Sequence, residues 1–484
     1  MPLIQVIRKH PYAAMLVGLT CIGLFLRLYK LDAFAQFLGD QGRDAIVLKR
    51  IVTLEHFPAV GAPSSIGQVY LGPFYYYLIA PWLLLGNFNP IGPAIGVAVF
   101  STLFIPIMYF GLSQLFNKET GLVAAVFVTF SSTLVSLSRF SWNPNLLPLF
   151  GFLAIFSLLK ALDTHKKVYW ALAGVFFSCA MQLHYIVLAA GPGVVFLLGH
   201  YLYQQKKKLH RAIWNVSSMV VAFILTSLPL IVFDLRHDLL NISNFLRIFE
   251  QSQAASTSGG IWEIVKTFAA LSNFAFNISI QITLAIVLLI SLMLIPLSKP
   301  AKSNRFFPKI VLMFFLTLII TSYFTLNKYP HYFGFLYPLF LSIFAYILAT
   351  TLFYKSRSLL FLILGMFITF QISGYDFLWQ KGSYQIKRAQ SIAESIYPRI
   401  QTKKYQITSL PDHYGDSTQR YYLELWEKRP LDKDSRELAD ELFVMCEQPC
   451  KPIGDPQWDI AYFRPRSIAD TWDVEGVTIY KLVR

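Results

Sequence analysis

An acid, an arginine and a second acid follow the first apolar stretch of this chain at close spacing. Asp40, Arg43 and Asp44 lie in the run Phe37-Leu-Gly-Asp-Gln-Gly-Arg-Asp, with apolar sequence on both sides. Ionisable groups beside a membrane are costly, so they are usually paired or functional. A carboxylate can act as a general base, and an arginine can bind a phosphate through two hydrogen bonds. The other interpretation is a hydrated loop that contains an ordinary Asp–Arg pair.

Three more polar clusters lie between apolar runs, at residues 138–145, 233–238 and 327–332. The first contains Arg139 and Asn143, and the second contains Arg236 and His237. Arginines near acids at several such positions indicate an anion site, so we interpret Arg139 and Arg236 as further phosphate-binding candidates. The third contains His331, a candidate substrate contact. His184, near a helix end, is interpreted instead as a structural histidine.

The composition excludes a soluble globular protein. Of the 484 residues, 55% are hydrophobic and only 14% are charged, which is typical of a protein that crosses a membrane many times. The net charge of +15 is confined to the apolar part, because residues 376–484 hold 16 Lys/Arg and 17 Asp/Glu. We interpret the excess as topology signals and contacts to anionic membrane lipids. No nucleic-acid partner is predicted.

The apolar runs and the loop charges together predict the topology. The charge rule decides whether the aromatic, proline-containing run 69–86 crosses. If it does not, the loops on the N-terminal side hold 15 Lys/Arg against 9 opposite, and if it does, the counts become 7 and 17. We therefore predict eleven crossings, a cytoplasmic N-terminus that acts as a retained signal anchor, and a first external loop over 30–90. The apolar runs lie at 11–29, 69–86, 91–116, 119–137, 144–162, 168–186, 187–203, 212–233, 276–297, 309–326, 332–352 and 359–375.

Acids gather on one side of this topology. Eight of the ten acids before residue 376 fall in external loops, and only Glu119 and Asp163 are cytoplasmic. The second long external loop, 234–275, contains a polar, small-residue stretch at 251–260 that is expected to act as a flexible lid or linker. The chemistry is therefore expected to face outward.

The last part of the chain is predicted to be a separate unit. Hydropathy falls after Tyr375, an amphipathic helix is expected over 384–400, and short strands are expected at 405–410, 441–445 and 477–483. We predict a membrane domain over 1–375 and an external α/β domain over 376–484 that covers the site or selects the acceptor.

The cysteines and the absence of several known motifs limit the kinds of chemistry that this sequence predicts. Cys21 and Cys179 lie in apolar runs and are expected to pack, whereas Cys446 and Cys450 form either a local disulfide or two free thiols. No zinc motif or Ser-His-Asp triad occurs in the sequence, and we predict no metal or other cofactor. The sequence also has no glycine loop for nucleotide phosphates, which argues against an ATP-driven pump.

The order of these motifs resembles a known family. The motifs are Asp40-x-x-Arg43, Leu71-Gly-Pro-Phe-Tyr-Tyr-Tyr-Leu-Ile-Ala-Pro, Ser138-Arg139 before Asn143-Pro144, and Phe233-Asp-Leu-Arg-His. Together they resemble bacterial glycosyltransferases of the GT-C superfamily that use polyprenyl-phosphate sugars, of the protein O-mannosyltransferase and lipid A aminoarabinose transferase type. The resemblance covers the whole membrane part and is strongest over 35–160.

The resemblance implies a catalytic acid at Asp40, a phosphate-contacting arginine at Arg43 and a further donor-site arginine at Arg139. It also implies juxtamembrane helices in the first external loop. One departure is Gln41, where the family often has a second consecutive acid. Asp44, one helical turn beyond Asp40, could take its place.

We therefore predict a membrane glycosyltransferase that moves a sugar from a polyprenyl-phosphate donor to an extracytoplasmic lipid, glycan or protein, with inversion. Asp40 would be the base, and Arg43, Arg139 and Arg236 would hold the donor phosphate. The alternative is a transporter or flippase of lipid-linked sugars, although the sequence has no internal repeat and no acid deep in an apolar run. The remaining predicted substrate contacts are Asp44, Tyr75, Tyr76, Asn143, His237 and His331.

Overall fold

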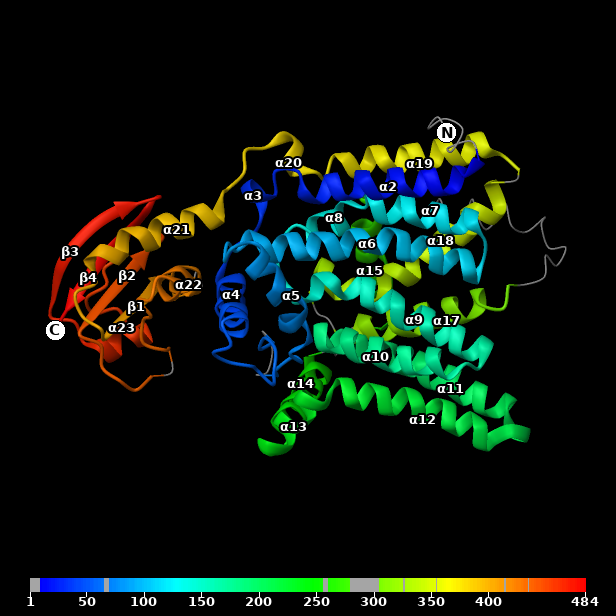
Figure 1. Cartoon of the computed structure of the whole chain (residues 1–484), viewed down its shortest axis with the longest axis horizontal. Helices are drawn as coiled ribbons and strands as arrows, with labels where there is room; N and C mark the ends of the chain where they lie inside the picture. The colour runs from blue at the N-terminus through cyan, green and yellow to red at the C-terminus, as the bar shows by residue number, and fades with distance from the viewer. Residues whose placement is uncertain are drawn as a thin grey trace.

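The chain forms a long bundle of apolar helices with a small mixed α/β unit at one end (Figure 1). This computed structural model describes residues 9–64, 69–255, 260–278, 304–324, 327–353, 355–412, 415–433 and 435–484. The predicted fold class, a helical apolar part followed by a small sheet unit, is confirmed.

Five helices in the described part of the chain are long and apolar enough to cross a membrane, and five more are apolar but shorter. The helices of the bundle are α2 (Pro11–Leu28), α3 (Leu31–Phe34), α4 (Gly39–Val52), α5 (Phe74–Leu85), α6 (Ile91–Leu115), α7 (Lys118–Phe130), α8 (Ser132–Leu137), α9 (Leu147–Thr164), α10 (Lys167–Leu183), α11 (Gly191–Gln204), α12 (Leu209–Thr226), α13 (Leu228–Arg236), α14 (Leu240–Ala255), α15 (Gly260–Phe276), α17 (Phe307–Phe324), α18 (Leu336–Leu352) and α19 (Arg357–Ile372). Short 3-10 helices join them: η1 (Asn143–Leu146), η2 (Tyr185–Ala190), η3 (Lys206–Lys208) and η5 (Pro330–Phe333).

The first external loop is helical, as the resemblance implied. It contains α3, α4 and α5, and α5 has only 12 residues. At 1.5 Å per residue α5 is about 18 Å long, too short for a hydrocarbon core of about 30 Å. Figure 1 shows α4 and α5 at the end of the bundle that faces the α/β unit, whereas α2 begins at the opposite end.

The predicted span 119–137 is two helices, α7 and α8, with a bend between them. In one continuous helix the amide of Ser132 would bind the carbonyl of Val128. Instead Arg27 Nη2 donates to the Val128 carbonyl at 3.0 Å, and the Ser132 amide donates to Gln371 Oε1 at 2.7 Å. Two buried side chains from other helices therefore satisfy both backbone groups freed by the bend.

The second external loop differs from its prediction. Residues 240–255 form α14 and residues 260–276 form α15, so most of the expected lid stretch 251–260 is helical. One side of α15 is apolar and buries Leu271, Ala275 and Phe276 in the bundle. The polar sequence before α15 is why a loop was predicted here. Residues 256–259 and most of the predicted span 276–297 lie outside the described residues.

The α/β unit has a four-stranded sheet in the order β1-β2-β4-β3, with β1 and β2 parallel and the other pairs antiparallel. The three predicted strands are present, and the expected helix 384–400 is α21 followed by η6. Strand β3 was missed because it is an exposed edge strand without an apolar pattern. The boundary after residue 375 stays a prediction. The elements are α20 (Asp376–Trp379), α21 (Gln385–Ile396), η6 (Tyr397–Arg399), β1 (Tyr405–Leu410), α22 (Ser417–Leu425), β2 (Glu441–Cys446), α23 (Trp458–Phe463), β3 (Ser467–Val474) and β4 (Val477–Val483).

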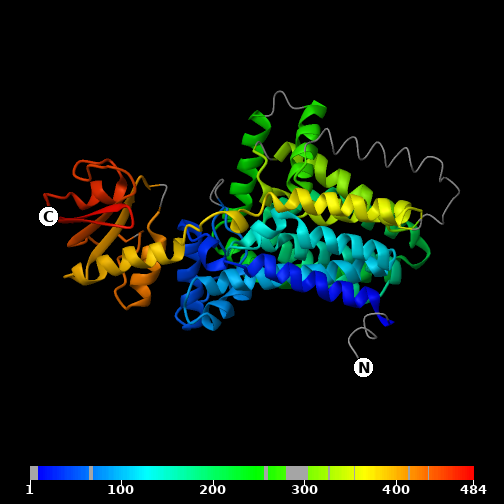
Figure 2. The same ribbon diagram turned by 90° about the horizontal axis from the view of Figure 1, so that it is seen from above.

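The α/β unit touches the bundle through α22, which packs on α4 (Figures 1 and 2). Phe37 meets Tyr421 and Tyr422 edge to face, with ring centroids 6.3 and 6.2 Å apart. Gly42 allows the close approach, because a Cβ there would lie 2.5 Å from the backbone nitrogen of Thr418. The helix that carries Asp40 and Arg43 is therefore held between the bundle and the α/β unit.

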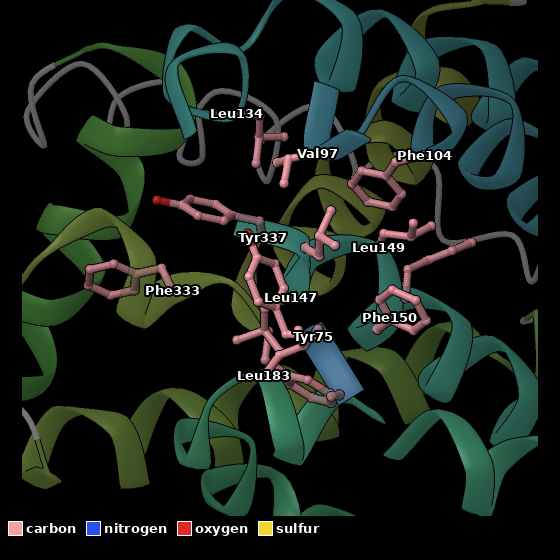
Figure 3. Close-up of a cluster of buried hydrophobic side chains, with 14 of the residues drawn as sticks. Tyr75, Val97, Phe104, Leu134, Leu147, Leu149, Phe150, Leu183, Phe333 and Tyr337 are labelled. Carbon is pink, nitrogen blue, oxygen red and sulfur yellow. The ribbon is translucent and has the colours of Figure 1, made fainter. Parts of the chain in front are cut away.

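A dense apolar core fixes the ends of several helices (Figure 3). Tyr75 of α5, Leu147 and Phe150 of α9, Leu183 of α10 and Phe333 of η5 are all less than 9% exposed. Such close packing leaves little freedom to the polar turns beside Leu147, Leu183 and Phe333.

Candidate active site

The start of α4 places Asp40 in its first turn. The backbone amide of Leu38 donates to Gln41 Oε1 at 3.0 Å, which closes the helix N-terminus. A negative charge in the first turn of a helix is favoured by the helix dipole. Gln41, the departure from the family pattern, therefore has a structural role, and the Asp40 carboxyl lies where the helix dipole favours a negative charge.

Arg43 lies between two carboxylates. Its Nη1 donates to Asp40 Oδ1 at 2.8 Å, while Nε and Nη2 donate to Asp44 Oδ1 at 3.0 and 2.8 Å. The Asp40 side chain is 49% exposed, that of Arg43 is 30% exposed and that of Asp44 is buried. Asp40 can therefore meet a substrate, whereas Asp44 serves to hold the guanidinium.

Asp44 has a second support. The Tyr76 hydroxyl donates to its Oδ1 at 2.9 Å, and no described group binds Oδ2. Burial raises the pKa of the Asp44 carboxyl, although Arg43 and Tyr76 act in the opposite direction. Burial also works to lower the pKa of Arg43, but Asp44, Tyr76 and Asp40 raise it overall. Arg43 is therefore a permanent cation.

A cavity of about 320 Å³ opens beside Asp40 and Arg43. Segments that are far apart in the sequence line it: residues 62–64 with Leu71 from the first external loop, 142–144, 184–185 and 331–332. Three of the four polar clusters singled out in the sequence therefore meet in one cavity. A carboxylate that can accept a proton and a cation that can bind an anion share its wall.

Aromatic and imidazole rings also line this cavity. The ring of Trp142 lies 4.7 Å from that of His331, and His184 lies 5.8 Å from His331 and 5.6 Å from Tyr332. Burial lowers the pKa of His184 to about 3, with a smaller effect of His331, and burial lowers that of His331 to about 4. Both imidazoles are therefore neutral at pH 7, and Arg43 is the cation that lines this cavity.

The fold of this chain is similar to those of known proteins. The structure of ArnT from Cupriavidus metallidurans bound to undecaprenyl phosphate is similar, with a TM-score of 0.61, 13% identity and 98% of each chain covered. The oligosaccharyltransferase of Archaeoglobus fulgidus in its apo form gives a TM-score of 0.54 at 13% identity, over 87% of this chain and 64% of that one. The chain has the GT-C fold.

The sequence comparisons are consistent with this fold. Residues 71–232 match the family described as dolichyl-phosphate-mannose-protein mannosyltransferase. Comparison with curated proteins gave no match. With its apolar helices and its GT-C fold, the chain is a multi-pass membrane protein.

Of the predicted substrate contacts, Asn143 lies in the lining of the cavity, and Tyr75 and Tyr76 lie outside it. Asn143 lines the cavity and its Nδ2 donates to the Leu183 carbonyl at 2.7 Å, so it also ends α10. Tyr75 and Tyr76 lie behind the lining and are buried. The hydroxyls of Tyr75 and Ser141 are 2.7 Å apart.

The structure places Arg139 away from the cavity. Its Nη1 donates to the Leu26 carbonyl at 2.7 Å and its Nη2 to the Tyr29 carbonyl at 2.8 Å, and its guanidinium lies 3.9 Å from the centre of the Phe377 ring. The side chain is 4% exposed. The predicted role of Arg139 in phosphate binding has no support in this geometry, because backbone carbonyls at the end of α2 occupy its donors.

Arg236 and His237 also lie outside the cavity lining. Both are exposed at the end of α13, and His237 stacks on Phe233 with ring centroids 4.1 Å apart. The buried acid of this cluster, Asp234, accepts from the amide of Asn241 at 2.6 Å. The cluster therefore shapes the turn between α13 and α14.

That turn supports one wall of the cavity. The Tyr70 amide donates to Asn241 Oδ1 at 2.8 Å, and the Tyr70 carbonyl accepts from the Tyr185 hydroxyl at 2.7 Å. The segment that ends at Leu71 is thus fixed to α14 and η2.

Sequence reasoning missed His184, Tyr185 and Tyr332 as lining residues. Their position at external helix ends, level with Asn143 and His331, was the signal that could have found them. In the described part of the chain, no group of three or more His, Cys, Asp or Glu side chains could hold a metal ion.

Proposed function

We propose that this chain is a membrane glycosyltransferase that transfers a sugar from a polyprenyl-phosphate donor to an extracytoplasmic acceptor. The observation that carries the proposal is the position of Asp40 and Arg43 on one wall of a cavity at the end of an apolar bundle. The ArnT structure with the same fold contains undecaprenyl phosphate, which supports a polyprenyl-phosphate donor here.

In the proposed reaction, Asp40 accepts the proton of an acceptor hydroxyl. The hydroxyl oxygen forms a bond to the anomeric carbon while the bond from that carbon to the phosphate oxygen breaks. A single displacement inverts the configuration of this carbon. General-base catalysis of this kind contributes about 10²- to 10⁴-fold to the rate.

Arg43 stabilises the leaving group. The phosphate charge grows from about −1 toward −2 as the bond breaks, so a fixed cation stabilises the transition state more than the bound donor. Arg43 has five N–H groups, and each terminal nitrogen has a second N–H beyond the bonds to the two acids. Asp44 keeps the guanidinium in place and offsets part of its charge.

The proposed orientation has the active face and the α/β unit outside the cytoplasm. Cys446 and Cys450 form a disulfide, one of the two possibilities that the sequence left open. Disulfides form and persist in oxidising compartments, which supports an extracytoplasmic α/β unit and a cytoplasmic N-terminus.

The test is transfer from radiolabelled polyprenyl-phosphate sugars in membranes that contain the wild type or Asp40→Asn at equal levels. We expect the variant to bind donor and to lose transfer by about 10²-fold or more. Equal transfer by both proteins would remove Asp40 from catalysis. Donor movement between leaflets without consumption would favour a flippase.

A further inference from the structure

A second and larger cavity lies in the α/β unit, with a volume of about 910 Å³. It is lined by residues 410–412 after β1, 448–451 after β2, 455–459 at the start of α23, and Lys433. Strands β1 and β2 are parallel, so their carboxyl ends meet at one edge of the sheet. In α/β folds, ligands bind at this edge.

The floor of the cavity is a connected polar network. Gln457 Nε2 donates to Thr408 Oγ1 at 3.0 Å and to Asp459 Oδ2 at 2.9 Å, and Thr408 Oγ1 donates to the same oxygen at 2.8 Å. These bonds fix the Asp459 carboxylate and the Gln457 amide. The two N–H groups of the Gln457 amide are used in these bonds, and its oxygen accepts from the Ile460 amide. The fixed Asp459 carboxylate can accept from a ligand hydroxyl through its other oxygen.

One rim of the cavity is an exposed indole. The Trp458 side chain is 71% exposed and is stacked on Tyr462, with ring centroids 5.6 Å apart and an angle of 16° between the rings. The Tyr462 hydroxyl donates to the Arg436 carbonyl at 2.8 Å, which anchors the pair. A rigid aromatic face in water beside fixed polar groups suits a ligand with one apolar face and many hydroxyls.

The loops around the cavity are restrained before any ligand arrives. Pro411, Pro449 and Pro456 limit the backbone of the three loops, and the disulfide between Cys446 and Cys450 closes the second loop. A restrained site loses little conformational entropy on binding.

The cavity is also close to the catalytic helix. Gly415 lies against Gly39, with 3.5 Å between a Cβ built on Gly415 and the Gly39 Cα. Asp412 lines the cavity and precedes Gly415 by three residues, which span at most about 11 Å. A molecule of a few sugar units bound at Asp412 could therefore extend toward Asp40.

We propose that this cavity binds the carbohydrate part of the acceptor, an inference that rests on the glycosyltransferase function proposed above. The aromatic face of Trp458 would stack on a sugar ring, and the Asp459 carboxylate, held in place by Gln457 and Thr408, would accept from its hydroxyls. The acceptor of this enzyme is then a glycan, carried on a lipid or on a protein, and the α/β unit selects it.

The test uses full-length protein in nanodiscs and, as probes, short gluco-, manno- and N-acetylglucosamine oligosaccharides without donor. We expect at least one series to bind the wild type and Asp40→Asn equally. Trp458→Ala should weaken binding about 3- to 10-fold, the size of one aromatic contact. Trp379→Ala is the matched control, because Trp379 is 69% exposed on another part of the surface. Asp459→Asn should weaken binding further, since it removes the charge from the fixed carboxylate.

The outcomes separate this inference from the proposed function. Absence of oligosaccharide binding to wild type, or equal binding by Trp458→Ala, overturns the inference, even if transfer depends on Asp40. If oligosaccharide binding depends on Trp458 but sugar transfer does not depend on Asp40, the proposed mechanism is wrong and the carbohydrate site is retained. The carrier is then identified by measuring transfer to a glycolipid and to a glycopeptide that both carry the bound oligosaccharide. The true acceptor is the one whose KM is higher with Trp458→Ala than with the wild type.

Discussion

Arg50 and Glu424, 374 residues apart in the sequence, join helix α4 to the α/β unit through a bidentate ion pair. Arg50 Nε donates to Glu424 Oε1 at 2.8 Å, and Nη2 donates to Oε2 at 2.7 Å. Lys49 adds a third charge at 3.6 Å from the same carboxylate. Since Arg50 and Asp40 share helix α4, this pair connects the α/β unit to the candidate active site.

Glu424→Gln should therefore weaken both stability and transfer. The carboxylate is 7% exposed, and loss of one partner from a largely buried pair costs about 3 kcal/mol. Thermal unfolding of the purified protein and the transfer rate measure the two effects. Asp470→Asn breaks the exposed pair with Arg399 and should change either by little. Recovery in the charge-reversed double variant Arg50→Glu/Glu424→Arg would assign the effect to this pair, and a fully active Glu424→Gln would contradict it.

Asp44→Asn should weaken donor binding and lower kcat together. Asp44 holds two nitrogens of Arg43 and lacks direct access to the cavity, so its loss misplaces the phosphate-binding cation. Hydrogen bonds to charged groups contribute about 1.5 to 3 kcal/mol, so the donor KM should rise about tenfold or more. Tyr76→Phe removes one hydrogen bond to Asp44 and should raise the donor KM by a smaller factor. A donor KM and a kcat equal to those of the wild type would contradict this positioning role of Asp44.

Arg139→Gln should lower stability and leave the donor KM of the folded protein unchanged. The guanidinium binds carbonyls at the end of α2, and Gln has too few donors and too short a reach to replace it. The melting temperature and donor saturation curves of the variant provide the test. A raised donor KM at an unchanged melting temperature would restore Arg139 to the phosphate site.

Acidification should destabilise the folded protein through His184 and His331. Their pKa values in the folded state are about 3 and 4, below the value near 6.5 of an unfolded chain. Between about pH 6.5 and 4 the unfolded state therefore binds protons that the folded state does not, so stability is full at pH 7 and falls with pH.

Melting temperatures measured across this range would show the loss, and His184→Asn should reduce it. The Asn side chain keeps an acceptor for the Ile186 amide, which His184 Nδ1 accepts at 3.1 Å. His237→Gln is the control, because His237 is exposed. If the melting temperature of His184→Asn falls as steeply with decreasing pH as that of the wild type, the prediction is wrong.

The sequence predicted those features that depend on local pattern. Apolar runs identified most bundle helices, loop charges kept α5 out of the count of crossings, and alternation identified β1, β2 and β4. Asp40, Arg43 and His331 were placed together because all lie at helix ends on one side. The number of crossings remains a prediction, because residues 279–303 lie outside the described part.

The features that local sequence does not reveal depend on tertiary contacts. Arg139 and Arg43 both lie near the same end of the bundle, and nothing local distinguishes an arginine that binds carbonyls from one that faces a cavity. The bend between α7 and α8 is stable only because Arg27 and Gln371 supply partners from distant helices. His184 was assigned a structural role because its neighbours in the cavity come from other segments.

The contact of Gly42 with Thr418 limits how this protein can be recombined. A single methyl group at position 42 would meet backbone atoms of Ser417 and Thr418, which cannot rotate away as a side chain can. The two units are therefore matched parts and not interchangeable modules. A chimaera that takes its last hundred or so residues from another protein of this fold must also bring a backbone shaped to this glycine, or the catalytic helix will be displaced.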